Sequence, residues 1–304
     1  MNQQPSTKYL VVVGGPTASG KTHVGIEIAK HFKTEIISAD SRQFYKELNI
    51  GVAKPSGEEL EAIPHHFIGH RSIHDYYSAG EFERDVMSKL DLLFKKHDTV
   101  VMVGGSGLFI NAVLHGFHPA PKDDGSIRKE IETLYNTQGV SALVEKLEIL
   151  DPENVNAIDK QNPQRLMRAI ERVMLTGKTQ AEQTKPARAK RPFSIIEIAI
   201  DHPRSVLYER VNKRVDQMIQ QGLLDEVKDL APFKHLNALH AVGYSELFEH
   251  LEGEVSLETA IEKIKQNTRR YAKRQVTWFK NKSESKWFAP DSFDDIVDFV
   301  EKNR

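Results

Sequence analysis

Hydrophobic residues along the chain occur either in short continuous runs or at helical spacing. Three of the runs are expected to be buried strands: Leu10 to Val13, Glu35 to Ser38 and Thr99 to Val103. Continuous apolar runs are typical of parallel strands that are covered on both faces. Helical patterns lie between these runs, and this β–α–β order predicts an α/β fold with a parallel sheet flanked by helices.

The pattern changes in the middle of the chain, where helical spacing replaces the strand-like runs. Helices are expected at 126–135, 140–147 and 162–176. We therefore predict a helical insertion domain at 121–192, which ends in a basic loop at 185–192. The core domain would comprise residues 1–120 and 193–304, with further strands at 194–200 and 287–288 and a terminal helix at 293–301.

The strongest chemical signal is a glycine-rich segment between the first expected strand and the next helix. It fits the phosphate-loop pattern G-x-x-x-x-G-K-[ST] at every fixed position, and its residues are Gly15, Pro16, Thr17, Ala18, Ser19, Gly20, Lys21 and Thr22. In this context backbone N–H groups surround a phosphate, and the helix N-terminus adds a positive end. Lys21 is expected to reach the outer phosphate oxygens, and the Thr22 hydroxyl to ligate Mg²⁺.

The phosphate loop predicts a ligand that carries a di- or triphosphate. The pattern alone suggests an ATP site, but it does not decide whether the phosphate is transferred, hydrolysed or released as a leaving group. Other residues at the same edge of the sheet must decide this.

Two polar segments follow strands two and three. Asp40 and Ser106 lie there, and ligands of open α/β sheets bind beyond the carboxyl ends of the strands. Asp40 is a candidate Mg²⁺ ligand or general base, with a helix cap or turn as the alternative. The glycines around Ser106 permit close backbone approach to a ligand, or else form a tight turn with positive φ.

Basic residues concentrate in two expected helices, although the net charge of the whole chain is −1. In the first, which starts at Pro163, Leu166, Ile170 and Val173 form the apolar face, while Arg165, Arg168 and Arg172 share another. The second runs from 260 to 282 and carries eight cations against the single acid Glu262: Lys263, Lys265, Arg269, Arg270, Lys273, Arg274, Lys280 and Lys282. Such helices are either solvated faces or a surface that binds a polyanion such as nucleic acid.

Composition excludes several functions. The chain of 304 residues contains no cysteine, which rules out disulfides, thiol nucleophiles and cysteine-based zinc sites. The histidines at 65, 66 and 70 lack the spacing and the carboxylate of a metal site, so a loop is expected there. No run approaches the roughly 20 apolar residues of a membrane span. These features favour a cytoplasmic protein, and nothing demands more than a monomer.

Seven motifs in a fixed order resemble one family. They are GPTASGKT, ISADSRQFYK, GVAKP, VGGSGLF, NPQRLMRAIE, HAVGY and KRQVTWFK, spread from about Tyr9 to Phe288. The chain resembles the bacterial tRNA dimethylallyltransferases, which have a P-loop NTPase-like fold. The resemblance implies transfer of a dimethylallyl group from dimethylallyl diphosphate to N6 of the adenosine 3′ of the anticodon in tRNA. The diphosphate would be released, and Mg²⁺ would be the cofactor.

The same resemblance implies roles for individual residues. The phosphate loop would hold the donor's diphosphate, Asp40 would be the general base, and Thr17 and Arg214 would lie near the reacting groups. The helical insertion would contact the anticodon stem-loop. The residues that match tRNA-contacting positions are Asp40, Ser41, Arg42, Gln43, Ser106, Arg128, Gln164, Arg165, Leu166, Met167, Arg168, Lys273, Arg274, Gln275 and Lys280. The family often has threonine where Ser106 stands, so a hydroxyl is kept and a methyl group is lost.

Two other classes of function are compatible with the residues alone. An ATP-dependent small-molecule kinase would use the same loop and fold, with the helical insertion as a lid. A non-enzymatic RNA-binding module would use the loop only to bind a phosphate. A GTPase is not expected, because the chain has no N-K-x-D guanine signature.

Overall fold

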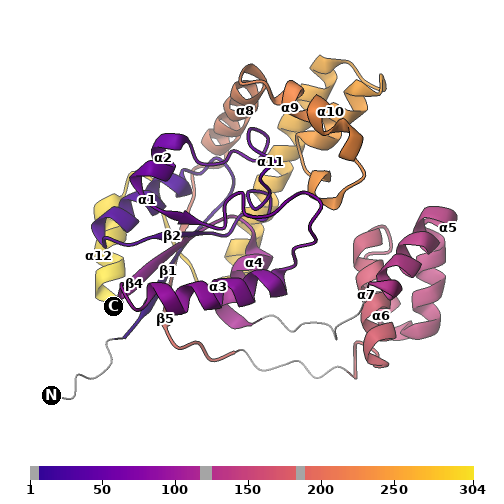
Figure 1. Ribbon diagram of the computed structural model, residues 1–304, viewed down its shortest axis with the longest axis horizontal. Coiled ribbons are helices and arrows are strands. Elements are labelled where there is room, and N and C mark those ends of the chain that lie inside the picture. Colours follow the sequence, from indigo (N-terminus) through magenta and orange to yellow (C-terminus); the bar gives the residue numbers. More distant parts are fainter. Residues whose placement is uncertain (1–6, 117–124, 183–188) are drawn as a thin grey trace. The chain divides into compact units, whose positions relative to one another are not determined.

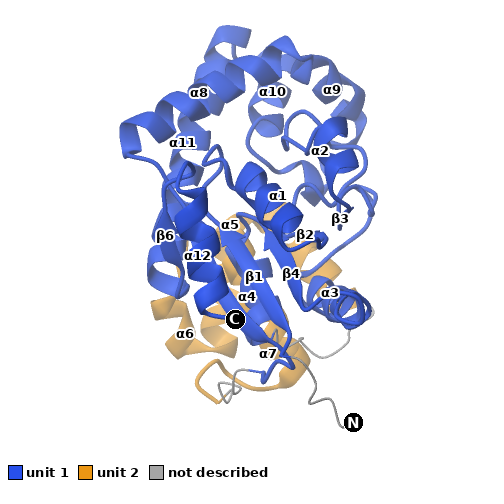
Figure 2. Cartoon of the chain, turned by 90° about the vertical axis from the view of Figure 1, so that its left-hand side faces the viewer, with its two compact units in different colours: residues 1–117, 189–304 blue, residues 118–188 orange. Residues whose placement is uncertain are grey.

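The computed structural model describes residues 7–116, 125–182 and 189–304. The chain folds as two compact units, residues 1–117 with 189–304 and residues 118–188 (Figure 2). The predicted basic loop at 185–192 lies partly outside the described residues, as does the start of the chain. The two units are described separately below.

A sheet of six parallel strands forms the centre of the first unit, in the order β3-β2-β4-β1-β5-β6. The strands are β1 (Tyr9–Gly14), β2 (Ile36–Ser38), β3 (His65–His66), β4 (Thr99–Val103), β5 (Ser194–Ile200) and β6 (Lys286–Phe288). The predicted parallel sheet is confirmed. One expectation was wrong: the segment with His65 and His66 forms a short strand beside β2, not only a loop.

Alternate residues of the strands pack against helices on opposite faces of the sheet. Val11 and Val13 face α1 (Lys21–His31) and α12 (Phe293–Lys302). Leu10 and Val12 face α3 (Ala79–Leu93) and α4 (Gly107–His115). Figure 1 shows the sheet between these two helical layers. All four valine and leucine side chains are at most 1% exposed, which explains why β1 is apolar throughout.

A second group of helices lies beyond one end of the sheet (Figure 1). It has its own apolar core and comprises α8 (Arg204–Gln220), α9 (Leu223–Leu230), α10 (Tyr244–Leu251) and the first part of α11 (Leu257–Lys282), with 3₁₀ turns at Ala231–Phe233 and Asn237–Leu239. The short α2 (Gly57–Ala62) precedes β3. Helix α11 continues to the sheet, where Phe279 joins the core beneath α3 and α4. None of the described helices, the 26-residue α11 included, has the length and apolar composition needed to cross a membrane.

The second unit consists of three described helices, α5 (Ser126–Leu150), α6 (Pro152–Ala157) and α7 (Pro163–Thr176). Helix α5 has a break at Gly139, where φ is 75°, so it consists of two helical segments, as the sequence predicted. Leu143, Leu147 and Ile170 lie in a common core between α5 and α7. Asn162 caps α7 by accepting from the Arg165 N–H at 3.2 Å.

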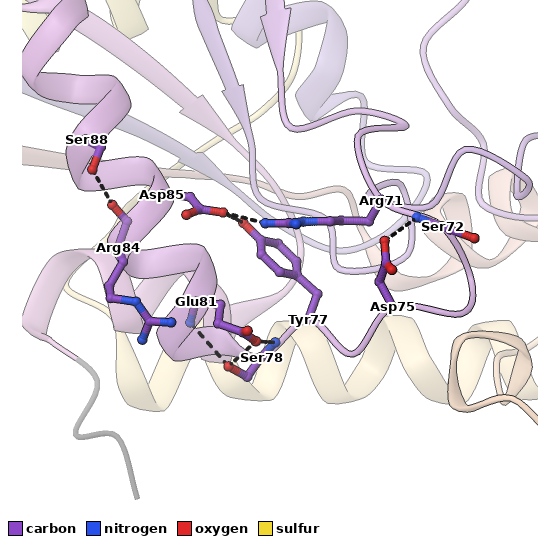
Figure 3. Close-up of polar contacts among 9 residues, drawn as sticks. All are labelled: Arg71, Ser72, Asp75, Tyr77, Ser78, Glu81, Arg84, Asp85 and Ser88. Carbon is purple, nitrogen blue, oxygen red and sulfur yellow. Dashed lines mark hydrogen bonds and ion pairs between the residues drawn. The ribbon is translucent and has the colours of Figure 1, made fainter. Parts of the chain in front are cut away.

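The start of α3 offers a stability test within one helix. Ser78 and Glu81 form a capping box: the Ser78 hydroxyl accepts from the Glu81 N–H, and the Glu81 carboxylate accepts from the Ser78 N–H (Figure 3). Loss of such a cap typically costs about 1 kcal/mol. We expect Ser78→Ala to lower the free energy of unfolding by about that amount in urea denaturation. Ser88→Ala is the matched control, since the Ser88 hydroxyl only donates to a carbonyl within the helix; equal losses would contradict the capping role.

Candidate active site

The phosphate loop connects β1 to α1 as the sequence predicted, and two of its glycines are required by geometry. Gly15 has φ +141°, and a Cβ there would lie 2.4 Å from the carbonyl oxygen of Ile200 on β5. Gly20 has φ +92° and immediately precedes the first residue of α1, Lys21. Because the loop lies against β5 at the carboxyl end of the sheet, no residue with a side chain fits at Gly15.

Two cations and one carboxylate meet beside this loop. The Lys21 ammonium donates to the carbonyl oxygen of Pro16 at 3.2 Å, and the Arg214 guanidinium of α8 donates to the Thr17 hydroxyl at 3.4 Å. Burial lowers the pKa of Lys21 to about 8; neighbouring Asp40 raises it, and Arg214 lowers it further. Burial also lowers the pKa of Arg214. An anion bound between these cations would relieve their desolvation and mutual repulsion.

Helices α8 and α11 fix the backbone of the phosphate loop. Arg210 donates to the carbonyl oxygen of Ala18 at 2.8 Å. Gln275 accepts from the Thr17 N–H at 2.8 Å and donates to the carbonyl oxygen of Gly105 at 2.9 Å. Gln275 is 6% exposed and both ends of its amide are bonded inside the protein, so in this structure it holds the phosphate loop against the end of β4, and its contact with tRNA stays a prediction.

Asp40 follows β2 and lies next to the phosphate loop. Its Oδ1 atom accepts from the Arg42 N–H at 3.0 Å, so the turn that was the alternative interpretation of this aspartate is present. The Ser106 hydroxyl accepts from the Ser41 N–H at 3.0 Å and donates to the Ser41 hydroxyl at 3.2 Å. Ser106 therefore ties the end of β4 to the segment that carries Asp40.

Arg42 and Gln43, both predicted to contact tRNA, use their side chains within the protein. The Arg42 guanidinium donates to the carbonyl oxygens of three residues before α10, namely Asn237, Ala238 and His240. The Gln43 amide donates to the carbonyl oxygens of Val52 and Ala53. Both side chains thus shape the walls around Asp40.

The glycines after β4 are required by close contacts within the protein and not by a positive φ. A Cβ at Gly104 would lie 2.3 Å from the carbonyl oxygen of Ala39, and one at Gly105 would lie 2.3 Å from the Gln275 amide nitrogen. At Gly107 it would lie 2.3 Å from the Trp278 ring. The turn from β4 to α4 spans only three residues, but none of the three glycines has a positive φ, so that part of the alternative interpretation was wrong. The close packing brings α11 directly against the strand end.

A buried aromatic group and a polar triangle support the Asp40 segment, and the sequence analysis did not find them. Phe44 is fully buried, stacked on Phe82 with ring centroids 5.0 Å apart, and in edge contact with Tyr77. The Tyr77 hydroxyl and the Arg71 guanidinium both donate to one carboxylate oxygen of Asp85 at 2.8 Å (Figure 3). The backbone N–H of Arg71 donates to the backbone carbonyl oxygen of Phe44 at 2.9 Å. This arrangement holds the chain just after Asp40.

A cavity of about 370 Å³ joins these groups. Thr17, Lys21, Asp40 and Arg214 line its polar part. Its apolar part is lined by residues of α8, of α11 and of two connecting segments: Val52, Val211, Val215, Met218, Val242 and Ile264. Tyr271 and Arg274 of α11 also line the cavity. A polar end that fits a diphosphate thus adjoins an apolar end that fits a small hydrocarbon group.

Helix α11 presents part of its basic residues on a surface groove of about 540 Å³, lined by Arg270, Lys273, Arg274, Thr277, Trp278, Asn281 and Lys282. Lys280 lies over the Trp287 ring, 5.6 Å from its centroid. Two other cations of α11 pair with acidic residues on neighbouring helices, which a count of charges within α11 alone does not include. Lys263 pairs with Glu249, and Lys265 pairs with Asp216 at 2.9 Å. Fewer of the eight cations are therefore left to bind a polyanion than the sequence predicted.

In the second unit, the predicted contact residues divide into exposed and buried ones. Arg165, Arg168 and Arg172 line one groove of about 380 Å³ together with Gln164. Arg128 donates to the Gln164 side chain at 3.1 Å. The side chains of Leu166 and Met167 are 0% and 2% exposed in the core of this unit, and the expected contact of these two residues with tRNA stays a prediction. The helical period had already placed Leu166 on the apolar face.

Comparison with known proteins gives a consistent result. The chain matches the model of the IPP transferase family over residues 43–282. The tRNA dimethylallyltransferase of Christiangramia forsetii is 49% identical, and the match covers 97% of this chain and 98% of that protein's length. The tRNA dimethylallyltransferase 1 of Phocaeicola vulgatus is 44% identical over 96% of this chain and 97% of its own.

Solved structures agree. The crystal structure of a tRNA isopentenylpyrophosphate transferase from Bacillus halodurans is 36% identical, covers 97% of this chain and 96% of its own, and has a TM-score of 0.72. A eukaryotic dimethylallyltransferase acting on tRNA has a TM-score of 0.78 over 98% of this chain and 77% of its own. At 23% identity the latter shows a shared fold alone.

A phosphate loop at the carboxyl edge of a parallel sheet defines a P-loop NTPase-like enzyme, as predicted. The family model covers most of the chain, and the relatives match along almost their full length. The chain therefore belongs to the IPP transferase family, the tRNA dimethylallyltransferases. The predicted enzyme class, a tRNA prenyltransferase, is confirmed.

Proposed function

We propose that the chain transfers the dimethylallyl group of dimethylallyl diphosphate to N6 of the adenosine 3′ of the anticodon in tRNA. The observation that carries this proposal is the single cavity in which the phosphate loop, Asp40 and an apolar wall adjoin one another. The polar end takes the diphosphate and the apolar end takes the five-carbon group. The names of the relatives support tRNA as the acceptor.

The reaction forms one carbon–nitrogen bond and breaks one carbon–oxygen bond. The adenine N6 attacks C1 of the donor, the diphosphate leaves with the electron pair of the C1–O bond, and Asp40 accepts the N6 proton. An adenine amine is a poor nucleophile because its lone pair is delocalised into the ring, so a base within hydrogen-bond reach contributes to the rate. Loop N–H groups, Lys21 and Arg214 stabilise the departing charge in a preorganised way.

The residues beside the loop fit the expected Mg²⁺. A small cavity of about 50 Å³ is lined by the oxygen-bearing side chains of Thr22, Ser38 and Asp40. Mg²⁺ is usually held by one or two protein oxygens together with phosphate oxygens and water. The Thr22 hydroxyl would hold the ion, together with phosphate oxygens and water. When bound, Mg²⁺ neutralises part of the diphosphate charge.

Recognition of tRNA is proposed for the exposed basic residues of both units. Lys273 and Arg274 of α11 line one groove, Arg274 also lines the cavity, and Lys280 lies on the same helix over the Trp287 ring. In the second unit, Gln164, Arg165 and Arg168 line a groove, and Arg128 is bonded to Gln164. The target base must leave its stack in the anticodon loop to reach the cavity, at a cost of a few kcal/mol. Phosphate contacts would offset that cost. We place this reaction in the cytoplasm, with the chain acting as a monomer.

The direct test is a transfer assay. The protein is incubated with Mg²⁺, labelled dimethylallyl diphosphate and unmodified tRNA that has adenosine next to the anticodon. We expect label on the tRNA and release of diphosphate, and no label on tRNA with another base at that position. Absence of label from the first RNA would refute the proposal.

Salt dependence provides a separate check of RNA binding through α11. The logarithm of the binding constant should fall linearly with the logarithm of salt concentration, by about 0.7 for each phosphate contact to a single strand. We expect Lys273→Ala to reduce that slope by about one contact. Lys265→Ala is the matched control, because Lys265 is paired with Asp216 and Glu262. A slope that is unchanged in the first variant would leave Lys273 as a solvated residue.

A further inference from the structure

A carboxylate away from the phosphate loop is surrounded by donors from the cavity wall. Glu226 of α9 accepts from three consecutive backbone N–H groups, those of Asn49 at 3.2 Å, Ile50 at 2.8 Å and Gly51 at 3.1 Å. The Tyr244 hydroxyl is a fourth donor, 2.7 Å from Oε1 of Glu226. Several donors on one charged group make this contact stronger than bonds between neutral partners.

The Tyr244 ring makes a second contact with the same segment. Tyr244 is fully buried, and a Cβ at Gly51 would lie 2.6 Å from its ring carbon and its hydroxyl oxygen. Gly51 has no positive φ, so the need for glycine comes from this close approach. Burial and the neighbouring Glu226 raise the pKa of Tyr244, which keeps its hydroxyl protonated as a donor.

The segment is also held at its far end. The Gln43 amide donates to the carbonyl oxygens of Val52 at 3.2 Å and Ala53 at 2.9 Å. Gly51, Val52 and Ala53 line the same cavity of about 370 Å³ as the phosphate-loop residues Thr17 and Lys21. Residues 49–53, called the wall segment here, are therefore fixed by Glu226 at one end and by Gln43 at the other.

We propose that Glu226 is a positioning residue for the hydrocarbon end of the prenyl donor. It acts through the wall segment, whose Val52 contributes to the apolar part of the cavity, and it touches no reacting atom. The inference rests on the proposed function, because it assigns the apolar part to the dimethylallyl group. Removal of the carboxylate leaves three backbone N–H groups without their acceptor, so the wall segment should shift while the phosphate loop stays in place.

Two probes separate the ends of the cavity. Inorganic diphosphate reports the polar end, and dimethylallyl thiodiphosphate, which resists cleavage, reports both ends. In calorimetric titrations with Mg²⁺, we expect Glu226→Ala to bind the thiodiphosphate about tenfold more weakly and diphosphate within about twofold of the unchanged protein. Gly51→Ala should act in the same direction by pushing the wall segment off the Tyr244 ring. Asp225→Asn, which removes the same charge one residue away on the exposed side of α9, should change neither.

The outcomes distinguish this inference from the proposed function. If the unchanged protein binds the thiodiphosphate no more tightly than diphosphate, the assignment of the apolar end fails. If the unchanged protein binds the thiodiphosphate more tightly and Glu226→Ala leaves the ratio of the two affinities unchanged, the positioning role is overturned. This includes the case in which the variant binds both probes more weakly by the same factor. Tyr244→Phe keeps the ring and removes one donor, so a loss of about threefold in the ratio is expected even if the alanine variant does not fold.

Discussion

Asp40→Asn is expected to reduce the turnover of prenyl transfer by about 10²–10⁴-fold, the usual contribution of a positioned general base. Asparagine keeps an oxygen that can accept from the Arg42 N–H, so the turn should be preserved. Binding of dimethylallyl diphosphate and of tRNA should therefore remain within a few-fold of the unchanged protein. Single-turnover kinetics with saturating donor, together with separate binding titrations, measure the two effects.

Asp75→Asn is the matched control for Asp40→Asn. Asp75 also accepts a backbone N–H, that of Ser72 at 2.8 Å (Figure 3). Asp75 does not line the cavity. Its substitution should leave turnover unchanged. Full turnover in Asp40→Asn would remove this residue from the role of base. A loss of donor affinity as large as the loss of rate would instead assign Asp40 to binding, as expected of a metal ligand.

Local patterns were sufficient for five of the six strands of the central sheet and for the phosphate loop. The run from Leu10 to Val13 is apolar because both faces of β1 are covered, and the glycine pattern that follows depends on backbone geometry within eight residues. The break of α5 at Gly139 was likewise visible as two separate helical patterns. These features are encoded by neighbouring residues, so a sequence analysis can find them.

Features that depend on distant partners were missed. Gln275 was predicted only as a tRNA contact, whereas its side chain also accepts a hydrogen bond from the phosphate loop, 258 residues away along the chain. Glu226 and the wall segment are separated by 175 to 177 residues, and nothing near either one signals the contact. The motif that predicted tRNA contacts is a contiguous stretch, so it includes Leu166 and Met167, whose side chains pack inside their unit. The strand β3 has only two residues, too few for a periodic pattern.

Lys21→Met is expected to lower kcat/KM for the donor by about 10²–10³-fold, because it removes a preorganised cation at the departing diphosphate. Unlike Asp40→Asn, it should weaken the binding of inorganic diphosphate as well as the rate. Lys30→Met is a suitable control, since Lys30 is exposed at the end of the same helix and paired with Glu27. An unaltered affinity for diphosphate in Lys21→Met would show that other groups carry the binding.

The lowered pKa of Lys21 also predicts a pH dependence. Lysine is charged below its pKa, so kcat/KM for the donor should decline as pH rises through about 8, the value for the free protein. Between about pH 8 and pH 10.5, the ordinary pKa of lysine, Lys21 binds fewer protons in the folded chain than in the unfolded chain. The free energy of unfolding should therefore rise with pH in that window, because the cost of burying a charged Lys21 is lost. Lys21→Arg keeps its charge and should lose the alkaline decline. A decline that persists near pH 8 in this variant would assign it to another group.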